Sequence, residues 1–297
     1  MFDPVLRMFN LSKIMEGFWL VSTEHLEDRL WFKDDEDFKA GMNNVAILAA
    51  RMPAQIMAFV LMSNHVHFVV GGDKDDACDF VSSFKKRYSQ YYSGKYTLRG
   101  LLGKNKIDLR ELSFSNESFE RAIAYVQMNP VAANICIHPS GYPWGTGSSF
   151  YYTVQSKRKT IANLSQAESI RLLHSRQVLP PHYVVDERGF IDPVSYVNVD
   201  FVQSVFRSPN RMSYFLNASS KAKKETGVPS FSDKLISMAL RELCISVFNK
   251  PDMVELSEGQ MAELLKQLRY RFSMDPNQLA RVCGVPYEKV TRLLDSF

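Results

Sequence analysis

Two histidines separated by one residue, His65 and His67, are the first place where this sequence could do chemistry. In a β-strand, residues two apart point to the same face of the sheet, so both imidazoles would share one side while Val66 turns into the core. Two imidazoles on one face are a ready-made pair of metal ligands. The triplet alone is weak evidence, because any strand that faces a polar groove can carry it.

Tyr125 and Asn129 form the second pair of candidate residues. Positions i and i+4 of a helix lie on one face a single turn apart, so a nucleophile and an amide ligand would be neighbours. Each residue also has a plainer interpretation. Tyr125 could be an aromatic residue that packs a helix on the sheet, and Asn129 could bond its own backbone before Pro130.

Together the two pairs suit the cleavage of a phosphodiester. The phosphate oxygens repel a nucleophile, so a divalent metal must neutralise their charge and orient the phosphate. Two imidazoles and one amide oxygen are neutral ligands that leave coordination sites open for the phosphate. A phenolate can be displaced again, so a phosphotyrosine intermediate conserves bond energy for strand joining. A free phenol has a pKa of about 10 and needs activation, and the sequence does not identify the base.

The predicted secondary structure places both pairs on regular elements. Apolar spacing predicts a strand over 17–22, a helix over 35–52, two strand segments over 55–70, and helices over 76–92 and 116–127. His65 and His67 fall on the second of the two strand segments, after a turn at Ser63-Asn64. Asn116 is expected to cap the last of these helices, and the Asn129-Pro130 step to end it.

Two motifs in this order resemble those of the single-tyrosine HUH transposases. The segment 58–70 resembles their histidine-hydrophobe-histidine motif, which a Met-Pro-Asn triplet commonly precedes; here Met62-Ser63-Asn64 has serine in place of proline. The segment 124–131 is similar to the Tyr-Ile-x-x-Asn-Pro-Val signature of the REP-associated tyrosine transposases, and Tyr142-Pro143-Trp144 resembles the start of their Tyr-Pro-Trp-Ser-Ser tail. The resemblance covers residues from about 12 to 152, around half of the chain.

The resemblance implies an α+β catalytic domain with a ferredoxin-like antiparallel sheet of the HUH nuclease type. It implies Tyr125 as the catalytic nucleophile, and His65, His67 and Asn129 as ligands of magnesium or manganese. The substrate would be single-stranded or hairpin DNA, cut and rejoined through a 5′-phosphotyrosine. Related transposases are often dimers and the REP-associated branch is associated with monomers, so the chain is expected to be a monomer or a homodimer.

The second half of the chain has a different composition and is expected to be a mostly helical extension. We expect a catalytic domain over 1–155 and the extension over 156–297. Residues 276–296 follow a helix-turn-helix pattern, with Gly284 in the turn. The exposed positions of its second helix would be Tyr287, Glu288, Lys289, Thr291 and Arg292. Of these, Lys289 and Arg292 are candidate DNA contacts, although such hairpins also serve as plain structural supports.

A second candidate DNA-binding segment lies between the two motifs. Lys85, Lys86, Arg87 and Tyr88 combine positive charge with an aromatic ring, an arrangement that could bind phosphates and stack an unpaired base. Helix packing explains the aromatic residues equally well.

Composition narrows the class of protein. The chain has 297 residues, 45% of them hydrophobic, and a formal net charge of +4, which permits a nucleic-acid partner without requiring one. The four cysteines are far apart and form no CxxC pair, so a reducing, cytoplasmic setting is expected. No stretch approaches the roughly 20 apolar residues that cross a bilayer, so no membrane association is expected.

Three alternatives stay open at this point. The protein could be a domesticated relative that acts on repetitive palindromes and no longer moves its own element. It could be a non-catalytic DNA-binding regulator derived from a transposase. It could also be a metal-dependent hydrolase that uses the histidine pair and water, and so forms no covalent adduct.

Overall fold

The protein is described here by a computed structural model. Its described residues are 17–24, 30–97, 105–151, 158–226, 233–272, 274 and 276–295. The domain boundary expected near residue 155 lies outside them, as does residue 296 at the end of the expected helix-turn-helix.

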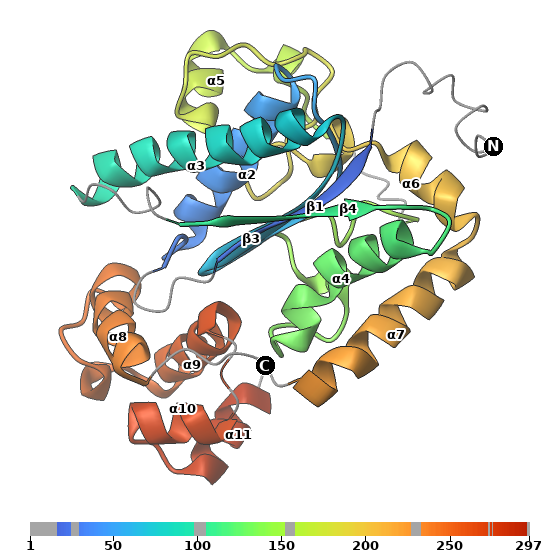
Figure 1. The fold of residues 1–297 in the computed structure, drawn as a ribbon. Coiled ribbons are helices and arrows are strands. Elements are labelled where there is room, and N and C mark those ends of the chain that lie inside the picture. Colours follow the sequence, from blue (N-terminus) through green and yellow to red (C-terminus); the bar gives the residue numbers. More distant parts are fainter. Residues whose placement is uncertain are drawn as a thin grey trace.

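A four-stranded antiparallel sheet forms the centre of the molecule (Figure 1). The strands are β1 (Phe18–Thr23), β2 (Gln55–Met62), β3 (His65–Gly71) and β4 (Ile107–Leu112), in the spatial order β2-β3-β1-β4. The two-residue turn at Ser63-Asn64 joins β2 to β3, so both predicted strand segments are confirmed. The predicted α+β class is therefore confirmed, and the elements run in the order β-α-β-β-α-β.

Helices cover both faces of this sheet (Figure 1). On one face lie α2 (Asp35–Ala49) and α3 (Lys74–Tyr96). Phe68 of β3 packs against Phe80 and Phe84 of α3, with ring centroids 5.5 Å apart in each pair. On the opposite face lies α4 (Ser118–Ala132), with α7 (Pro209–Thr226) packed along it. The alternation along β3 therefore turns Phe68 toward α3 and the neighbouring His67 toward α4.

The end of α4 differs from the expectation. The helix continues to Ala132, so Pro130 lies inside it and the predicted stop at Asn129-Pro130 is wrong. Pro130 has no N–H to donate to the Val126 carbonyl one turn earlier, so the last turn lacks one backbone hydrogen bond and the helix nevertheless continues for two more residues. At the other end the cap residue is Glu117, although Asn116 Oδ1 accepts the Ser118 N–H at 3.0 Å.

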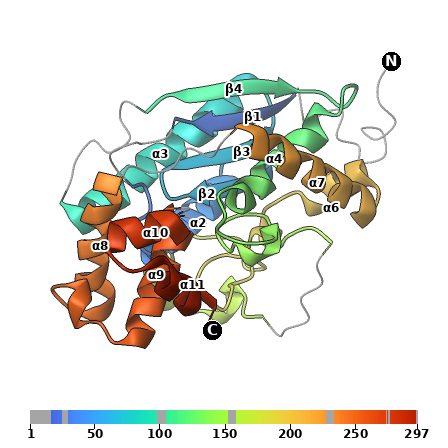
Figure 2. The ribbon, with the colours of Figure 1, turned by 90° about the horizontal axis from the view of Figure 1, so that it is seen from below.

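The remaining elements follow α4 along the chain. Between α4 and α7 lie the 3₁₀ turns η2 (Pro139–Gly141), η3 (Ile161–Asn163) and η4 (Pro193–Ser195), and helices α5 (Gln166–Leu173) and α6 (Val199–Phe206). The last part contains α8 (Asp233–Phe248), η5 (Met253–Glu255), α9 (Glu258–Phe272), α10 (Pro276–Cys283) and α11 (Tyr287–Asp295). We call the group from α8 to α11 the C-terminal unit; its helices lie together at one end of the molecule (Figure 2).

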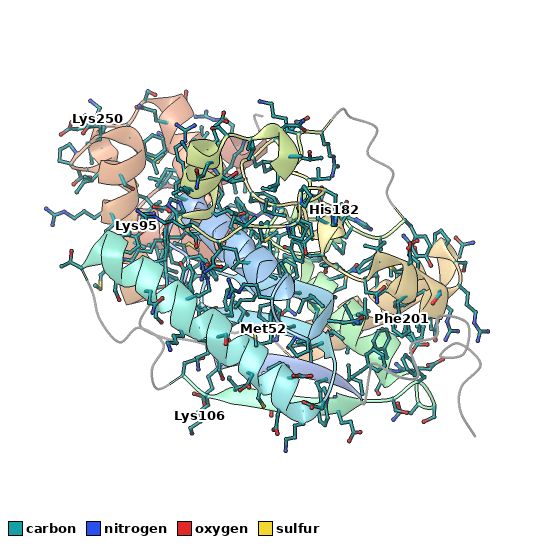
Figure 3. All side chains as sticks on the ribbon, turned by 90° about the horizontal axis from the view of Figure 1, so that it is seen from above. Met52, Lys95, Lys106, His182, Phe201 and Lys250 are labelled. Carbon is teal, nitrogen blue, oxygen red and sulfur yellow. The ribbon has the colours of Figure 1, made fainter. Side chains whose placement is uncertain are left out.

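The boundary between the hydrophobic cores lies further along the sequence than the change in composition near residue 155. The main core runs from Phe18 to Leu216 and includes Phe190 and Phe201. Phe201 of α6, labelled in Figure 3, stacks on Phe18 of β1 with ring centroids 5.4 Å apart. A second core is formed by the C-terminal unit together with Leu30. Residues 158–216 therefore pack with the sheet, and the residues from 233 onward form the separate helical core.

The outer edge of β2 is covered by two later segments, one at Val197-Asn198, where Asn198 N–H donates to the Ile56 carbonyl at 2.9 Å, and one at 144–146. Leu61 N–H donates to the Trp144 carbonyl at 2.9 Å and Thr146 N–H donates to the Phe59 carbonyl at 3.0 Å. Between them, Gly145 pairs with Val60 in an isolated bridge. The Tyr-Pro-Trp segment singled out in the sequence is thus an edge cover for the sheet. In the described residues, no helix is long and apolar enough to cross a membrane.

Candidate active site

His65 and His67 lie side by side on β3 and face α4. Their ring centroids are 4.8 Å apart with planes at 78°, and the side of the sheet that they share is covered by protein. Exposure is 6% for His65 and 2% for His67. The sequence prediction that the two imidazoles share one face is borne out by this geometry.

Each imidazole is oriented by a neighbour on its Nδ1 side. His65 Nδ1 lies 2.7 Å from Asn64 Oδ1, and His67 Nδ1 lies 2.8 Å from Ser22 Oγ. Because an amide oxygen only accepts, His65 must donate from Nδ1, and in that tautomer Nε2 carries the lone pair that a metal takes. A hydrogen bond to the second ring nitrogen is the usual way in which metal-binding histidines are held.

Ser22 and Asn64 were not singled out from the sequence. Ser22 reaches His67 because β1 pairs with β3 in a register that places these two residues opposite each other. That register depends on the pairing of strands more than forty residues apart, which the local pattern does not contain. Asn64 could have been found, since it precedes His65 in the turn.

Tyr125 comes from α4 and meets the histidine pair. Its ring centroid is 5.1 Å from that of His67, with the planes at 77°. Burial raises the pKa of the Tyr125 phenol, and a hydrogen bond with the Asn129 side chain partly offsets this. The plainer interpretation of Tyr125 is therefore also satisfied in part, because the ring does pack against the sheet.

Asn129 lies one turn further along α4, with 6% of its surface exposed. Its Nδ2 donates to the Tyr125 backbone carbonyl at 2.9 Å, which is the backbone bond that the plainer interpretation foresaw. This bond uses the nitrogen end of the amide and fixes the orientation of the group. The oxygen end is the one that binds magnesium or manganese.

The side chains at this site can be compared with the ligands that a metal ion needs. Among the described residues, no group of three His, Cys, Asp or Glu side chains could hold a metal ion. A metal at this place would therefore depend on His65, His67 and a neutral oxygen, and Asn129 is the amide that α4 brings beside Tyr125. The two Nδ1 contacts and the held amide fit such a site.

The basic segment of α3 lies on the other face of the sheet. Lys85 donates to the Asn105 carbonyl, and Arg87 Nε donates to Asn44 Oδ1 at 3.0 Å, while Lys86 is exposed. Tyr88 has no exposed surface and donates to the Trp31 carbonyl. The prediction that Tyr88 stacks on a base is wrong, because its ring is part of the aromatic core between α3 and the sheet.

The expected helix-turn-helix residues have the predicted local structure. Helices α10 and α11 are joined through Gly284, whose φ is +61°, in the left-handed region that glycine tolerates. Lys289 and Arg292 are exposed on α11, and Arg292 pairs with Glu258 at 2.7 Å.

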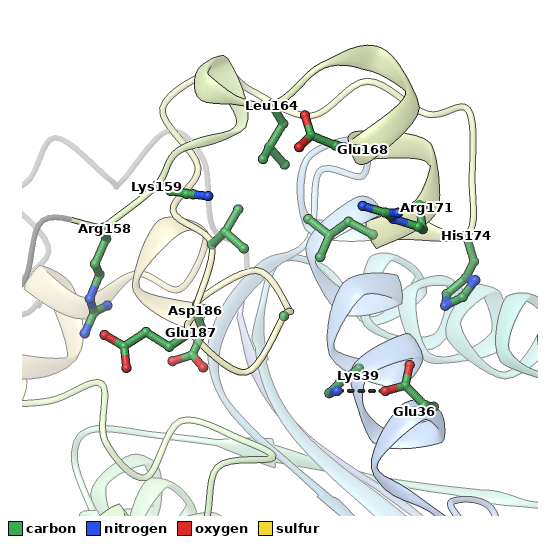
Figure 4. Close-up of a pocket in the computed structure, with 13 residues that line it drawn as sticks. Glu36, Lys39, Arg158, Lys159, Leu164, Glu168, Arg171, His174, Asp186 and Glu187 are labelled. Atoms are coloured by element: carbon green, nitrogen blue, oxygen red, sulfur yellow. Dashed lines mark hydrogen bonds and ion pairs between the residues drawn. The ribbon is translucent and has the colours of Figure 1, made fainter.

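A separate cavity of about 630 Å³ lies beside α2 and α5 (Figure 4). Its lining carries four Lys or Arg and four Asp or Glu side chains, and Lys39 pairs with Glu36 at 2.7 Å. Such balanced charge favours neither an anionic nor a cationic ligand. We therefore place the candidate site at His65, His67, Tyr125 and Asn129.

Comparison with known proteins gives a limited result. No family model matches the chain, and no curated sequence matches it. One solved structure with some likeness is a REP-associated tyrosine transposase bound to a REP hairpin. It is 17% identical, with a TM-score of 0.36, and the match covers 45% of this chain and 78% of that one.

Proposed function

We propose that this protein is a metal-dependent DNA strand transferase that uses Tyr125 as its nucleophile. The observation that carries the proposal is the meeting of three predicted residues from two elements: the His65–His67 pair on β3 and Tyr125 on α4, with ring centroids 5.1 Å apart between His67 and Tyr125. Asn129, hydrogen-bonded to the Tyr125 side chain, completes the site. The four residues come from segments about sixty residues apart, which the fold must bring together.

The proposed fold type follows from the element order. A β-α-β-β-α-β order with both crossover helices on one face is that of a ferredoxin-like sheet. In the HUH arrangement proposed here, the sheet presents the histidine pair and the next helix presents the tyrosine. The position of β3 and α4 supports this assignment.

The reaction is a transesterification at phosphorus. The Tyr125 oxygen forms a bond to phosphorus while the bond from phosphorus to the 3′-oxygen breaks, which leaves a 5′-phosphotyrosine and a free 3′-hydroxyl. The phenol proton is lost, and the leaving oxygen gains one. Magnesium or manganese held by His65, His67 and Asn129 would neutralise the phosphate charge and favour the phenolate. Burial of Tyr125, which raises its pKa, makes this assistance necessary.

The substrate that we propose is single-stranded or hairpin DNA. The exposed residues of α11, Lys289 among them, are proposed to add contacts to DNA phosphates. We propose in the same way that the chain is organised as a catalytic part and a helical DNA-binding part.

The experiment that tests this function is a search for a covalent adduct. Wild-type protein is mixed with manganese and end-labelled hairpin DNA, and adducts are separated on a denaturing gel. We expect an adduct in the wild type and its loss in Tyr125→Phe, with DNA binding unchanged. Tyr214→Phe is the matched control, since Tyr214 is 65% exposed on α7.

The other outcomes separate the alternatives. Cleaved DNA without any adduct would indicate a metal-dependent hydrolase. Binding without cleavage would indicate a non-catalytic regulator. An adduct that persists in Tyr125→Phe would show that another residue is the nucleophile.

A further inference from the structure

The turn that leads into His65 is held by a contact from the far end of the chain. Ser63 Oγ donates a hydrogen bond to the backbone carbonyl of Arg271, 208 residues away in α9. The Ser63 carbonyl accepts the N–H groups of Trp31 and Phe32 at 2.8 and 3.2 Å. Ser63 itself is 3% exposed. The turn is therefore fixed between the segment before α2 and the C-terminal unit.

Asn64, the next residue of the turn, connects Ser63 to the histidine pair. Asn64 Oδ1 lies 2.7 Å from His65 Nδ1, and His65 is paired with Met62 across the turn. A displacement of Ser63 would move Asn64, and with it the atom that orients the His65 ring. Metal affinity depends on such orienting contacts.

Arg271 is firmly attached on its own side. Its side chain is 3% exposed, its Nη2 lies 3.7 Å from Asp35 Oδ1, and its Nε donates to Gln267 Oε1 at 3.0 Å. Two other carboxylates at the start of α2 are bound by Lys95, whose Nζ lies 2.6 Å from Asp34 and 2.8 Å from Asp37. Lys95 lies at the end of α3 (Figure 3). The carbonyl that Ser63 contacts thus belongs to an anchored residue.

The docking of the C-terminal unit also buries apolar surface at the same place. Leu30, which precedes α2, is 6% exposed and belongs to the second core with Phe272 and Met274. Lys33 pairs with Glu242 of α8 at 3.5 Å. The unit is therefore joined to the segment 30–35 by an apolar contact and an ion pair.

We infer that the C-terminal unit positions the histidine pair through the contact of Ser63 with the Arg271 carbonyl, so that docking of the unit and metal binding strengthen each other. The inference rests on the proposed function, because it concerns the metal affinity of that site. Ser63 and Arg271 are positioning residues, since neither touches the reacting atoms. Such coupling is reciprocal. A change that weakens docking of the C-terminal unit lowers the metal affinity, and bound metal strengthens docking by the same factor.

The test compares three serine variants in the full chain. Ser63→Ala removes the donor, and Ser63→Thr keeps a hydroxyl. Ser82→Ala is the matched control, because Ser82 is exposed on α3 on the other face of the sheet. Manganese affinity is measured by calorimetry. Opening of the second core, which the C-terminal unit shares with Leu30, is measured as the rate at which a thiol reagent labels Cys244 and Cys283, which are buried in it, with each cysteine identified by mass spectrometry.

We expect Ser63→Ala to weaken manganese binding by about fivefold, the effect of losing one net hydrogen bond. Labelling of Cys283 should accelerate by a similar factor. Ser63→Thr and Ser82→Ala should resemble the wild type, and manganese should slow the labelling of Cys283 in the wild type.

Failure of the coupling and failure of the proposed metal site give different results. Equal manganese affinity in Ser63→Ala and Ser82→Ala would overturn the coupling while the proposed function stands. If the wild type binds no more manganese than His67→Ala, the proposed metal site is wrong and the coupling fails with it. The labelling rates then still show whether Ser63 holds the C-terminal unit.

Discussion

At the scale of single residues, the site depends on side chains outside the His-Val-His triplet. The pattern His-Val-His places two imidazoles on one face, but it leaves each ring free to rotate about its side-chain torsions. Ser22 on β1 and Asn64 in the turn restrict that rotation through the Nδ1 atoms. The motif therefore predicts which residues could bind a metal, whereas the neighbouring strand determines how they are held.

Removal of the Ser22 hydroxyl should weaken metal binding without unfolding the protein. Orienting partners of metal-binding histidines typically contribute tenfold to about a hundredfold in affinity, so we expect Ser22→Ala to lose about tenfold in manganese affinity. Calorimetry measures this loss, and thermal unfolding without metal should change little. Ser22→Thr, which keeps the hydroxyl, should retain most of the affinity; equal losses in both variants would show that the hydroxyl does not orient His67.

At the scale of elements, the strands and the first helices were predictable and the ends of elements were not. A stretch rich in Ile, Met, Phe and Val, broken at Ser63-Asn64, identified β2 and β3, and the turn between them was placed correctly. The stop at Pro130 was wrong because the proline costs the helix only one backbone hydrogen bond, whereas the burial of the end of α4, with Met128, Asn129 and Pro130 all buried, keeps the chain in the helix. Tyr88 was misplaced because helical spacing alone does not distinguish a buried aromatic face from an exposed one.

The close approach of Gly145 to β2 leads to a second prediction, which concerns stability. A Cβ added there would lie 2.6 Å from the Phe59 carbonyl oxygen and 3.0 Å from the Val60 Cα, both of which are backbone atoms of the sheet. Gly145→Ala must push the 144–146 segment away from β2, at a cost of about 1–3 kcal/mol. We expect a lower unfolding temperature by several degrees. In Gly259→Ala, nothing lies within 4 Å of the added Cβ, so this helical control should be neutral or slightly stabilising. Equal unfolding temperatures would contradict the role of the edge cover.

At the scale of the whole molecule, the hydrophobic cores decide where the chain divides, long-range polar contacts attach later segments to the first part, and composition reveals neither. Asn43 of α2 donates from Nδ2 to the Leu172 carbonyl at 2.8 Å and accepts the Ile191 N–H on Oδ1 at 2.9 Å. One buried amide thus ties two later segments to α2. The small polar residues after Trp144 belong to the segment that covers β2, where Thr146 and Ser149 are buried, whereas the main core and the second core are separated after Leu216.

Truncation tests this division. A chain that ends at residue 226 keeps every member of the main core, which runs from Phe18 to Leu216, and it should unfold in one cooperative transition. A chain that ends at residue 155 loses Phe190, Phe201 and Phe215 from that core. Each large buried side chain contributes about 1.5–3 kcal/mol, and a whole domain has only about 5–15 kcal/mol of stability, so this shorter chain should not fold. Circular dichroism and limited proteolysis distinguish the two chains. A folded chain of 155 residues would show that 158–216 is dispensable to the core; an unfolded chain of 226 residues would show that the C-terminal unit, through Leu30 and Arg271, is needed for the sheet to form at all.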